Sequence, residues 1–463
     1  MTRILLINPA MMDVYKIAKI KMSVPYHLPL NLLTIATPLL ERGYEVQLLD
    51  LNYHTDLEEA LINALNEFAP DYAGITFTTP LYSQSLRIIS QVKDYSNDII
   101  TIAGGVHITS DCMGTMKDSR IDIAVLGEGD FKLLEIIESD DIKVIKGIAY
   151  RSNGEISINE RDPGIKDLDR IPFPAISLID INQYKLPHTI RKLDPVCPLE
   201  TSRGCVYSCT YCNKSIFGKT FRVKSPERVI DDLKRIASLG FKEAHIVDDG
   251  FSTNINRAKE ICRLVIKENI DLLINCANGI RVDRIDYELL ELMKKAGIYR
   301  VSLGIESGSQ RILNNVDKGI KLEDYEKAFK MFRKVGIETL AYFMFGLPDE
   351  QESDMKKTIK FAKKLRPDVA KFSITIPLPS TPLYEDWKAK GYILTNNWDD
   401  YGFYTEKKIY EHPNLSLDTL TKYLDQSYRA FYFSPGYIIR KFFSSLKEGT
   451  LIEDFKMFVR IKW

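Results

Sequence analysis

Three cysteines lie within eight consecutive positions of the chain, at Cys205, Cys209 and Cys212. Their C-x3-C-x2-C spacing offers three thiolates to a 4Fe–4S cluster and leaves the fourth iron open to an outside ligand, whereas a four-cysteine cluster only carries electrons. An open iron implies substrate or cofactor chemistry. The alternative is a structural zinc site with Cys197 or His188 as its fourth ligand, although such sites usually combine two C-x2-C pairs.

The remaining cysteines do not suggest a disulfide framework. Seven cysteines at uneven spacing in a chain of 463 residues are atypical of secreted, disulfide-rich proteins. We expect Cys112, Cys262 and Cys276 to be small buried apolar residues. Cys197 precedes the triplet by eight residues and is a candidate to face the active site.

The composition is that of an ordinary globular protein, with 45% hydrophobic and 27% charged residues. Lys and Arg number 63, as do Asp and Glu, so the formal net charge is +0 and we expect no nucleic-acid partner. The longest apolar window, residues 28–40, is interrupted by polar residues and is too short for a membrane span. Since the amino terminus does not resemble a leader, the sequence predicts a cytoplasmic protein without a transmembrane segment.

The elements that must position the cysteines form two strand–helix series. In the first, from residue 3 to about residue 139, five short apolar runs alternate with stretches of helical period at residues 32–42, 57–68, 86–93 and 131–137. This alternation predicts an α/β domain with a doubly wound, Rossmann-like parallel sheet, whose ligand lies above the carboxyl ends of the strands. The segments at those ends are residues 8–9, 76–79, 104–107 and 127–129.

The second series begins shortly before the cysteine triplet and contains six strand–helix units. Helices are expected at residues 226–238, 257–268, 287–295, 322–334 and 353–365. Six units predict a partial (β/α)6 version of the TIM-type barrel, in which catalytic groups follow the carboxyl ends of the strands. The cysteine loop comes directly after the first of these strands.

Two shorter segments complete the chain. Residues 146–159 contain Asn153-Gly154 between two alternating runs, which predicts a hairpin with a type I′ turn, and the prolines that follow indicate an extended linker. After residue 384, a Tyr- and Phe-rich segment predicts a small, mainly helical region, and the apolar stripe of residues 451–463 is expected to pack on the barrel. The expected domains are therefore residues 1–145, 146–190, 191–384 and 385–463.

The cysteine spacing, with the aromatic Tyr211 before the last cysteine, resembles the signature of the radical S-adenosylmethionine (SAM) superfamily. The resemblance implies a 4Fe–4S cluster bound by the three cysteines, an open iron that holds SAM, and reductive cleavage of SAM to methionine and a 5′-deoxyadenosyl radical. It extends to later strand ends, where the superfamily contacts the amino group, ribose and carboxylate of SAM. The corresponding residues here are Asp248, Asp249, Asn278, Arg281, Glu306 and Ser307.

Each of these SAM-contact residues also has an ordinary structural explanation. Asp248 or Asp249 could cap the helix that follows, and Glu306 could pair with a lysine of the barrel. Their order along one barrel, after the cysteine triplet, favours the SAM site.

The first domain resembles the cobalamin-binding domain that precedes the radical SAM barrel in one large subgroup. The resemblance implies a corrin between the two domains, near Thr78, Gly104, Gly105, His107, Gly127, Glu128 and Gly129. The Asp-x-His-x-x-Gly motif that supplies a lower axial histidine in many cobalamin proteins is absent, since His54 after Asp50 does not fit its spacing. Base-off cobalamin without a histidine ligand is therefore expected.

Together these resemblances imply a cobalamin-dependent radical SAM enzyme with a small-molecule substrate and with flavodoxin or ferredoxin as electron donor. Methylation of an unactivated centre is the first expectation. Residues 428–432 also resemble the anaerobic magnesium-protoporphyrin monomethyl ester cyclase group, so oxidative cyclisation is the alternative, and a non-catalytic cobalamin or iron–sulfur sensor is a third. The aromatic and basic segment 428–447 would contact a hydrophobic substrate or a membrane surface, or, as we expect, pack as part of the C-terminal region.

Overall fold

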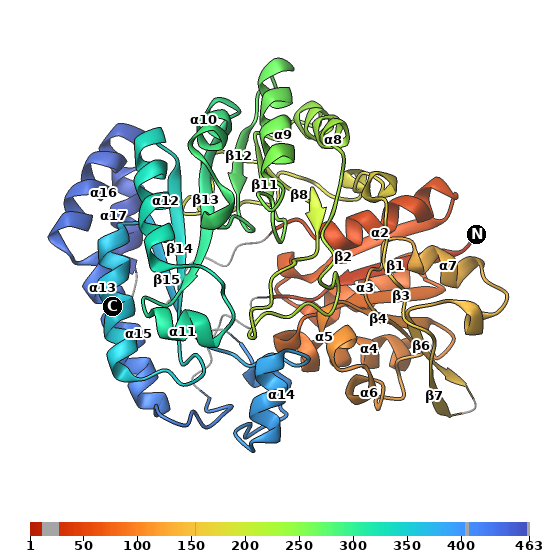
Figure 1. The fold of residues 1–463 in the computed structure, drawn as a ribbon. Helices are drawn as coiled ribbons and strands as arrows, with labels where there is room; N and C mark the ends of the chain where they lie inside the picture. Colours follow the sequence, from red (N-terminus) through yellow and green to blue (C-terminus); the bar gives the residue numbers. More distant parts are fainter. Residues whose placement is uncertain (12–26, 153, 403–406, 461–463) are drawn as a thin grey trace.

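The computed structural model describes residues 1–11, 27–152, 154–402 and 407–460. Two parallel sheets lie next to each other, each with its own helices (Figure 1). The first sheet contains the amino-terminal strands, and the second forms an open barrel from the middle of the chain. The C-terminal helices α16 and α17 lie on the side of the barrel that faces away from the first sheet (Figure 1).

The first sheet has seven strands in the order β2-β1-β3-β4-β5-β6-β7. Its first five strands are parallel, and the last two form an antiparallel hairpin at one edge. The strands are β1 (Arg3–Asn8), β2 (Glu45–Asp50), β3 (Tyr72–Thr76), β4 (Ile100–Gly104), β5 (Ile123–Val125), β6 (Ile148–Ser152) and β7 (Glu155–Ile158). The predicted hairpin therefore extends the first sheet. Its predicted turn includes Asn153, which lies outside the described residues.

Helices cover both faces of the first sheet, which confirms the doubly wound prediction. Helices α3 (Leu57–Phe68) and α4 (Tyr82–Tyr95) pack on one face, and α2 (Leu30–Glu41) and α7 (Lys132–Glu138) pack on the other. The short helices α5 (Val106–Ser110) and α6 (Cys112–Thr115) follow β4. Residues 4–7 of β1 are all buried, as expected for a parallel strand enclosed on both faces.

The second sheet has six parallel strands in the order β15-β14-β13-β12-β11-β8, as a partial (β/α)6 barrel requires. The strands are β8 (Val196–Leu199), β11 (Glu243–Ile246), β12 (Leu273–Cys276), β13 (Ile298–Glu306), β14 (Glu338–Phe345) and β15 (Val369–Ile374). The helices between them are α8 (Pro226–Ser238), α9 (Ile255–Lys267), α10 (Tyr287–Lys295), α11 (Gln310–Asn315), α12 (Leu322–Val335) and α13 (Glu352–Leu365). A two-stranded ribbon, β9 (Ser202–Arg203) with β10 (Arg222–Val223), brackets the cysteine loop.

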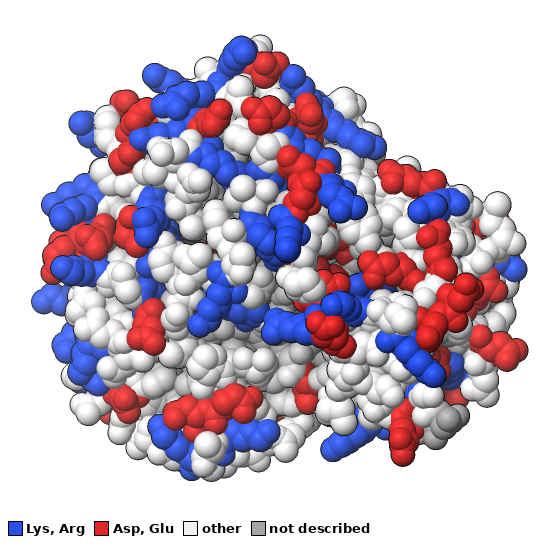
Figure 2. Space-filling model, turned by 45° about the vertical axis from the view of Figure 1, so that its right-hand side comes forward, with Lys and Arg blue, Asp and Glu red and all other residues white. Residues whose placement is uncertain are grey.

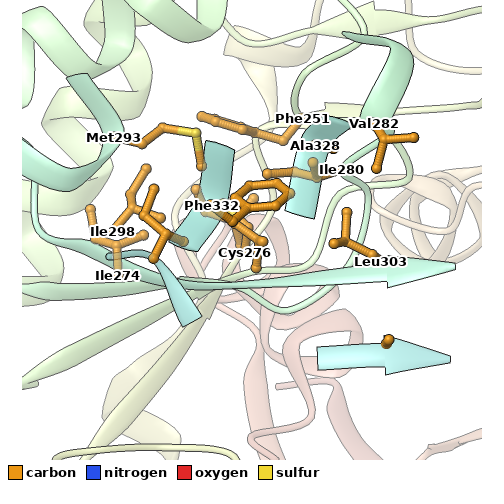
Figure 3. Close-up of a cluster of buried hydrophobic side chains, with 14 of the residues drawn as sticks. Phe251, Ile274, Cys276, Ile280, Val282, Met293, Ile298, Leu303, Ala328 and Phe332 are labelled. Atoms are coloured by element: carbon orange, nitrogen blue, oxygen red, sulfur yellow. The ribbon is translucent and has the colours of Figure 1, made fainter. Parts of the chain in front are cut away.

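Apolar side chains between the barrel strands and their helices hold this second unit together. Cys276 lies in this cluster with Phe251, Met293 and Phe332 (Figure 3). Cys262 belongs to the same cluster. Both cysteines are buried among apolar side chains, as the sequence predicts, and Cys112 is half-buried in the first domain.

The C-terminal region consists of α14 (Pro382–Ala389), α15 (Leu417–Tyr432), α16 (Pro435–Glu448) and α17 (Leu451–Arg460). Helix α15 packs on β15, where the Tyr428 hydroxyl donates to the Phe372 carbonyl at 3.0 Å. The expected packing of the last apolar stripe on the barrel is wrong for the residues of α17 whose burial is described, because Ile452 is 70% and Phe455 is 66% exposed. Among the described residues, no helix combines the length and apolar character needed to cross a bilayer.

Candidate cofactor and substrate site

The three cysteines lie on the loop between β9 and β10, at the carboxyl end of β8. All three are half-buried free thiols, and burial raises the pKa of Cys212 to about 11. The loop is fixed by its backbone, since the Thr210 amide donates to the Val316 carbonyl at 3.1 Å and the Leu383 amide donates to the Thr210 carbonyl at 3.0 Å. Gly204 precedes the loop at φ +83°, where a Cβ atom would lie 2.2 Å from the Thr220 carbonyl oxygen.

This loop suits an iron–sulfur cluster better than a zinc ion. Among the described residues, no three His, Cys, Asp or Glu side chains are grouped so that they could share one metal ion. A 4Fe–4S cubane does not require such a group, because each of its cysteines binds a different iron. The fourth zinc ligands considered from the sequence have other surroundings. Cys197 is buried in the barrel and lines the cavity between the two sheets, in agreement with its predicted position, and His188 lies 3.5 Å from Asp454 of α17.

A pair of arginines holds the middle of the cysteine loop. The guanidinium carbon of Arg281 lies 3.4 Å from the centroid of the Tyr207 ring, and the Arg284 Nε donates to the Tyr207 hydroxyl at 3.0 Å. Arg281 also donates to the Lys318 carbonyl at 3.1 Å. Arg281, predicted to contact SAM, thus links the cysteine loop to the segment after α11.

The two predicted aspartates at the end of β11 have different environments. Asp248 is fully buried, where it accepts hydrogen bonds from the Thr201 amide at 2.6 Å and the Ser202 hydroxyl at 2.6 Å. Burial raises the pKa of Asp248, and its oxygens are already engaged in joining β11 to the segment before the cysteine loop. Asp249 is exposed and accepts one bond, from the Gly204 amide at 3.1 Å. Asp249 therefore retains capacity to accept from a ligand.

Glu306 pairs with a barrel lysine, which was the structural alternative considered from the sequence. The Lys318 ammonium lies 2.8 Å from Glu306 and 3.3 Å from the Tyr211 hydroxyl. Burial alone would lower the pKa of Lys318, but the charges of Glu306 and Tyr211 raise it well above its usual value. These three side chains connect the end of β13 to the residue before Cys212, and Lys318 was not identified from the sequence. Ser307 is also buried and accepts from the Ser309 amide at 3.2 Å.

A cavity of about 790 Å³ opens between the two sheets, near the upper end of the range for ligand pockets, roughly 300–1,000 Å³. Residues from both units line it. Those predicted as contacts of a cofactor and found in its wall are Thr78, Gly104, Gly105, Gly127, Glu128, Gly129 and Asn278. Gly104 ends β4 and the other glycines lie in the turns after β4 and β5, so at these positions of the wall a large planar ligand can approach the backbone closely.

Glu128 is part of an ion-pair network that joins the two units. Its side chain is 4% exposed and lies 2.8 Å from Arg203 and 2.6 Å from Arg222. Asp130 and Glu200 also pair with Arg203, at 2.7 and 2.6 Å. Both carboxylate oxygens of Glu128 are therefore paired with arginines, although the prediction for this residue was a contact with the corrin. Arg203 and Asp130 were not identified from the sequence.

His107 does not line the cavity, in contrast to the predicted approach of this side chain to a corrin. The residue is fully buried, and its ring centroid lies 4.9 Å from that of Tyr82 and 5.3 Å from that of Trp398. The Nδ1 atom lies 3.2 Å from the Thr79 hydroxyl, and burial lowers the pKa of His107 to about 4. This environment gives His107 a packing role between α4 and the C-terminal region.

A glycine-edged, mainly parallel sheet that faces a (β/α)6 barrel with a three-cysteine loop defines an α/β protein with a large cavity between its two units. Residues 199–362 match the radical SAM superfamily, and residues 20–137 match the B12 binding domain. An uncharacterised methyltransferase of Pyrococcus horikoshii is 32% identical over 422 residues, which cover 90% of each chain. An anaerobic magnesium-protoporphyrin IX monomethyl ester cyclase of Rubrivivax gelatinosus is 27% identical and covers 82% of this chain and 69% of its own.

Solved structures show the same arrangement of domains. The cobalamin-dependent SAM radical enzyme OxsB, with aqua-cobalamin and SAM bound, superimposes with a TM-score of 0.75 at 17% identity over 98% of this chain and 72% of its own. The radical SAM methyltransferase TsrM from Kitasatospora setae gives 0.68 at 21% identity over 84% and 76%. The chain belongs to the radical SAM superfamily and carries the B12-binding domain of its cobalamin-dependent members. It is an enzyme whose cofactors are a 4Fe–4S cluster, SAM and cobalamin.

Proposed function

We propose that this enzyme methylates an unactivated carbon or phosphorus centre of a small molecule held between the first sheet and the barrel. The observation that carries the proposal is the single cavity whose walls come from both cofactor domains. Thr78 and Gly104 lie in one wall, and Asn278 and Arg203 lie in the other. Ile216 and Phe217 of the loop between β9 and β10 also line this space, whereas the three cysteines do not. A substrate here would therefore lie between the wall proposed for the corrin and the loop proposed to hold the cluster.

When bound, the cluster would supply an electron for the cleavage of one SAM molecule, and cobalamin would transfer a methyl group that it takes from a second SAM molecule. We propose that Cys205, Cys209 and Cys212 hold three irons of the cluster. Asp249 and Asn278 are exposed at the barrel rim and would accept or donate hydrogen bonds to SAM. The other predicted SAM contacts, Tyr211, Asp248, Arg281, Glu306 and Ser307, would position the loop and strand ends through the contacts described above.

The corrin would lie on the wall formed by Gly104, Gly105, Gly127 and Gly129, with Thr78 beside it. These backbones leave space, and the apolar side chains behind them exclude water from the sheet. We further propose that residues 1–145, together with the hairpin that extends their sheet, act as the cobalamin domain. Residues 191–384 would then act as the radical SAM domain, and residues 385–463 as a supporting region.

The substrate and reductant follow from this chemistry. Radical SAM enzymes require a small-molecule substrate and a source of electrons, and we propose flavodoxin or ferredoxin as donor because the sequence shows only one cluster motif. A cytoplasmic location would provide both the small-molecule substrate and the electron donor. Positive and negative side chains are interspersed over the face shown in Figure 2, which supports the proposal that nucleic acid is not a partner.

Oxidative cyclisation is a second candidate, because relatives named as anaerobic magnesium-protoporphyrin monomethyl ester cyclases align over about four fifths of the chain. The two reactions leave different products. The reconstituted enzyme is incubated anaerobically with SAM deuterated in its methyl group, a low-potential reductant and a small-molecule extract of the source cells. A product with a deuterated methyl group supports methylation. An unlabelled product that has lost hydrogen would support cyclisation and overturn the methylation proposal.

A further inference from the structure

The interior of the barrel is built in layers whose members follow from the strand register. Registers between neighbouring strands place His245 of β11 beside Asn275 of β12, and Asn275 beside Arg300 of β13. A second layer, nearer the carboxyl ends, aligns Gly304 with Tyr342, and Tyr342 with Lys371. With the exception of Gly304, all of these residues line the cavity between the two sheets.

In the lower layer, His245, Arg300 and the amide nitrogen of Asn275 already have partners, whereas the buried Oδ1 atom of Asn275 has none among the described residues. His245 lies 2.6 Å from Glu243, and the Asn275 amide nitrogen donates to the Ile190 carbonyl at 3.2 Å. Arg300 forms two bonds to Glu338, at 3.0 and 2.8 Å. His245 and Arg300 are therefore already paired with carboxylates of the barrel strands.

Lys371, in the second layer, lacks such a partner among the described residues. Its ammonium group has no hydrogen bond or ion pair to any residue in the described part of the chain and lies 5.8 Å from the centroid of the Tyr342 ring. Together with burial and His245, the charge of Lys371 lowers the pKa of His27. Burial and the cation Arg300 both lower the pKa of Lys371. An amine in such a place is costly to keep charged without an anionic partner.

The carboxylates on the surrounding strands cannot serve as that partner, because each is engaged elsewhere. Glu243 binds His245 and Tyr299, and Glu338 binds Arg300 and Lys192. Asp368, next to β15, accepts from the Thr339 amide at 2.8 Å. Glu306, at the end of β13, pairs with Lys318. Among the described residues, these strands therefore leave no carboxylate for Lys371, and the cavity that Lys371 lines has room for an anionic partner.

We infer that Lys371 binds an anionic group of the substrate, a carboxylate or a phosphoryl group, within the cavity between the two cofactor domains. The inference rests on the proposed function for the identity of the ligand as substrate. Ser302 and Tyr342 also line the cavity, and their side chains form a hydrogen bond with each other. Since one of the two hydroxyl groups donates in that bond, the other has a proton that it could donate to the same anion. Lys371 is thus a specificity-determining residue that fixes one end of the substrate against the barrel wall.

The inference is tested by the reactivity of this one amine in the holoenzyme. Protein loaded with iron, SAM and cobalamin is labelled with a trace of acetic anhydride, and acetylation of Lys371 is quantified by peptide mass spectrometry. Lys330, an exposed residue of α12, serves as the internal reference. Labelling is repeated with inorganic phosphate and, separately, with benzoate. We expect one of the two anions to reduce labelling of Lys371 several-fold while leaving Lys330 unchanged, and the effective anion distinguishes a phosphoryl group from a carboxylate.

Two results would overturn the inference. One is equal labelling of Lys371 with and without both anions. The other is protection by cobalamin alone, which would assign Lys371 to the corrin. Once a substrate is found, Lys371→Met should raise its KM by roughly ten- to a hundredfold, and Lys371→Arg should restore much of the loss. Anion protection without any methylated product would contradict the proposed function alone, whereas methylation without protection would contradict only this inference.

Discussion

Arg203 forms a bidentate pair with Asp130 across the junction of the two domains, with its guanidinium nitrogens 2.7 and 2.8 Å from the two carboxylate oxygens. Arg203 lies two residues before Cys205, and Asp130 directly follows the glycine-rich turn after β5. The pair therefore connects the start of the cysteine loop to the wall proposed for the corrin. It gives the two cofactor sites a fixed relative position.

Removal of the arginine should destabilise this junction. Arg203→Ala leaves the buried carboxylate of Asp130 without its arginine and leaves Glu128 with Arg222 alone, and breaking a buried pair in this way costs about 3–5 kcal/mol. Denaturant unfolding of the variant should show a loss of that size. Arg203→Lys retains the charge but not the bidentate geometry. Its free energy of unfolding should therefore lie between those of Arg203→Ala and the wild type. Equal stability of all three proteins would contradict a structural role for the pair.

Substitution of any triad cysteine should remove the cluster. Cys205→Ala, Cys209→Ala or Cys212→Ala should abolish the iron–sulfur absorbance and SAM cleavage while cobalamin uptake remains, because the corrin wall belongs to the other sheet. Cys112→Ala is the matched control, since Cys112 is a half-buried cysteine of the first domain. The Cys112→Ala variant should retain the iron of the cluster. A triple cysteine variant that still cleaved SAM would refute the assignment.

Gly104 offers a direct test of the corrin wall. A Cβ atom on Gly104 would meet only Val125, at 4.0 Å, so Gly104→Val should fold and place two methyl groups in or beside the cavity. We expect the variant to lose cobalamin and to keep its iron, as measured by metal analysis and absorption. Gly105 is less suitable, because its φ of +102° and a Cβ contact of 2.7 Å with the Phe77 carbonyl would disturb the turn itself. Undiminished cobalamin uptake by Gly104→Val would move the corrin site elsewhere.

His107 should make the protein sensitive to mild acid. Its pKa is about 4 in the folded state against 6.5 as the ordinary value, so below about pH 6.5 the unfolded chain binds a proton that the folded chain does not. Stability should therefore fall as the pH drops from 6.5 to about 4, by at most about 3 kcal/mol from this residue. His107→Phe fits the surrounding aromatic rings and should reduce the slope of unfolding free energy against pH in that range. The part due to His27, whose pKa burial also lowers to about 4, should remain. An unchanged slope would show that His107 does not titrate with unfolding.

The first and last residues of several helices could be predicted from the sequence. Helices α3, α8 and α10 begin and end where their apolar period and flanking residues predict, since Asp56, Ser225 and Asp286 each cap a helix through a side-chain oxygen. The cysteine loop and the alternation of strands and helices along the chain could be predicted for the same reason, because both are properties of short segments.

Contacts between distant segments could not be predicted in this way. The partners of Glu128, in Arg203 and Arg222, lie 75 or more residues away and depend on how the sheets pack. The pairing of Lys318 with Tyr211 is of the same kind. The amphipathic pattern of α17 predicts an apolar face, but the pattern does not determine whether that face meets the barrel.

The most direct test of the central claim is the content of iron, cobalt and zinc per chain after anaerobic reconstitution with iron, sulfide and hydroxocobalamin. Two cofactors facing one cavity predict about four irons and about one cobalt per chain, with the absorption spectrum of cobalamin that lacks a histidine ligand. Zinc in place of iron, or iron without any cobalt, would contradict the account.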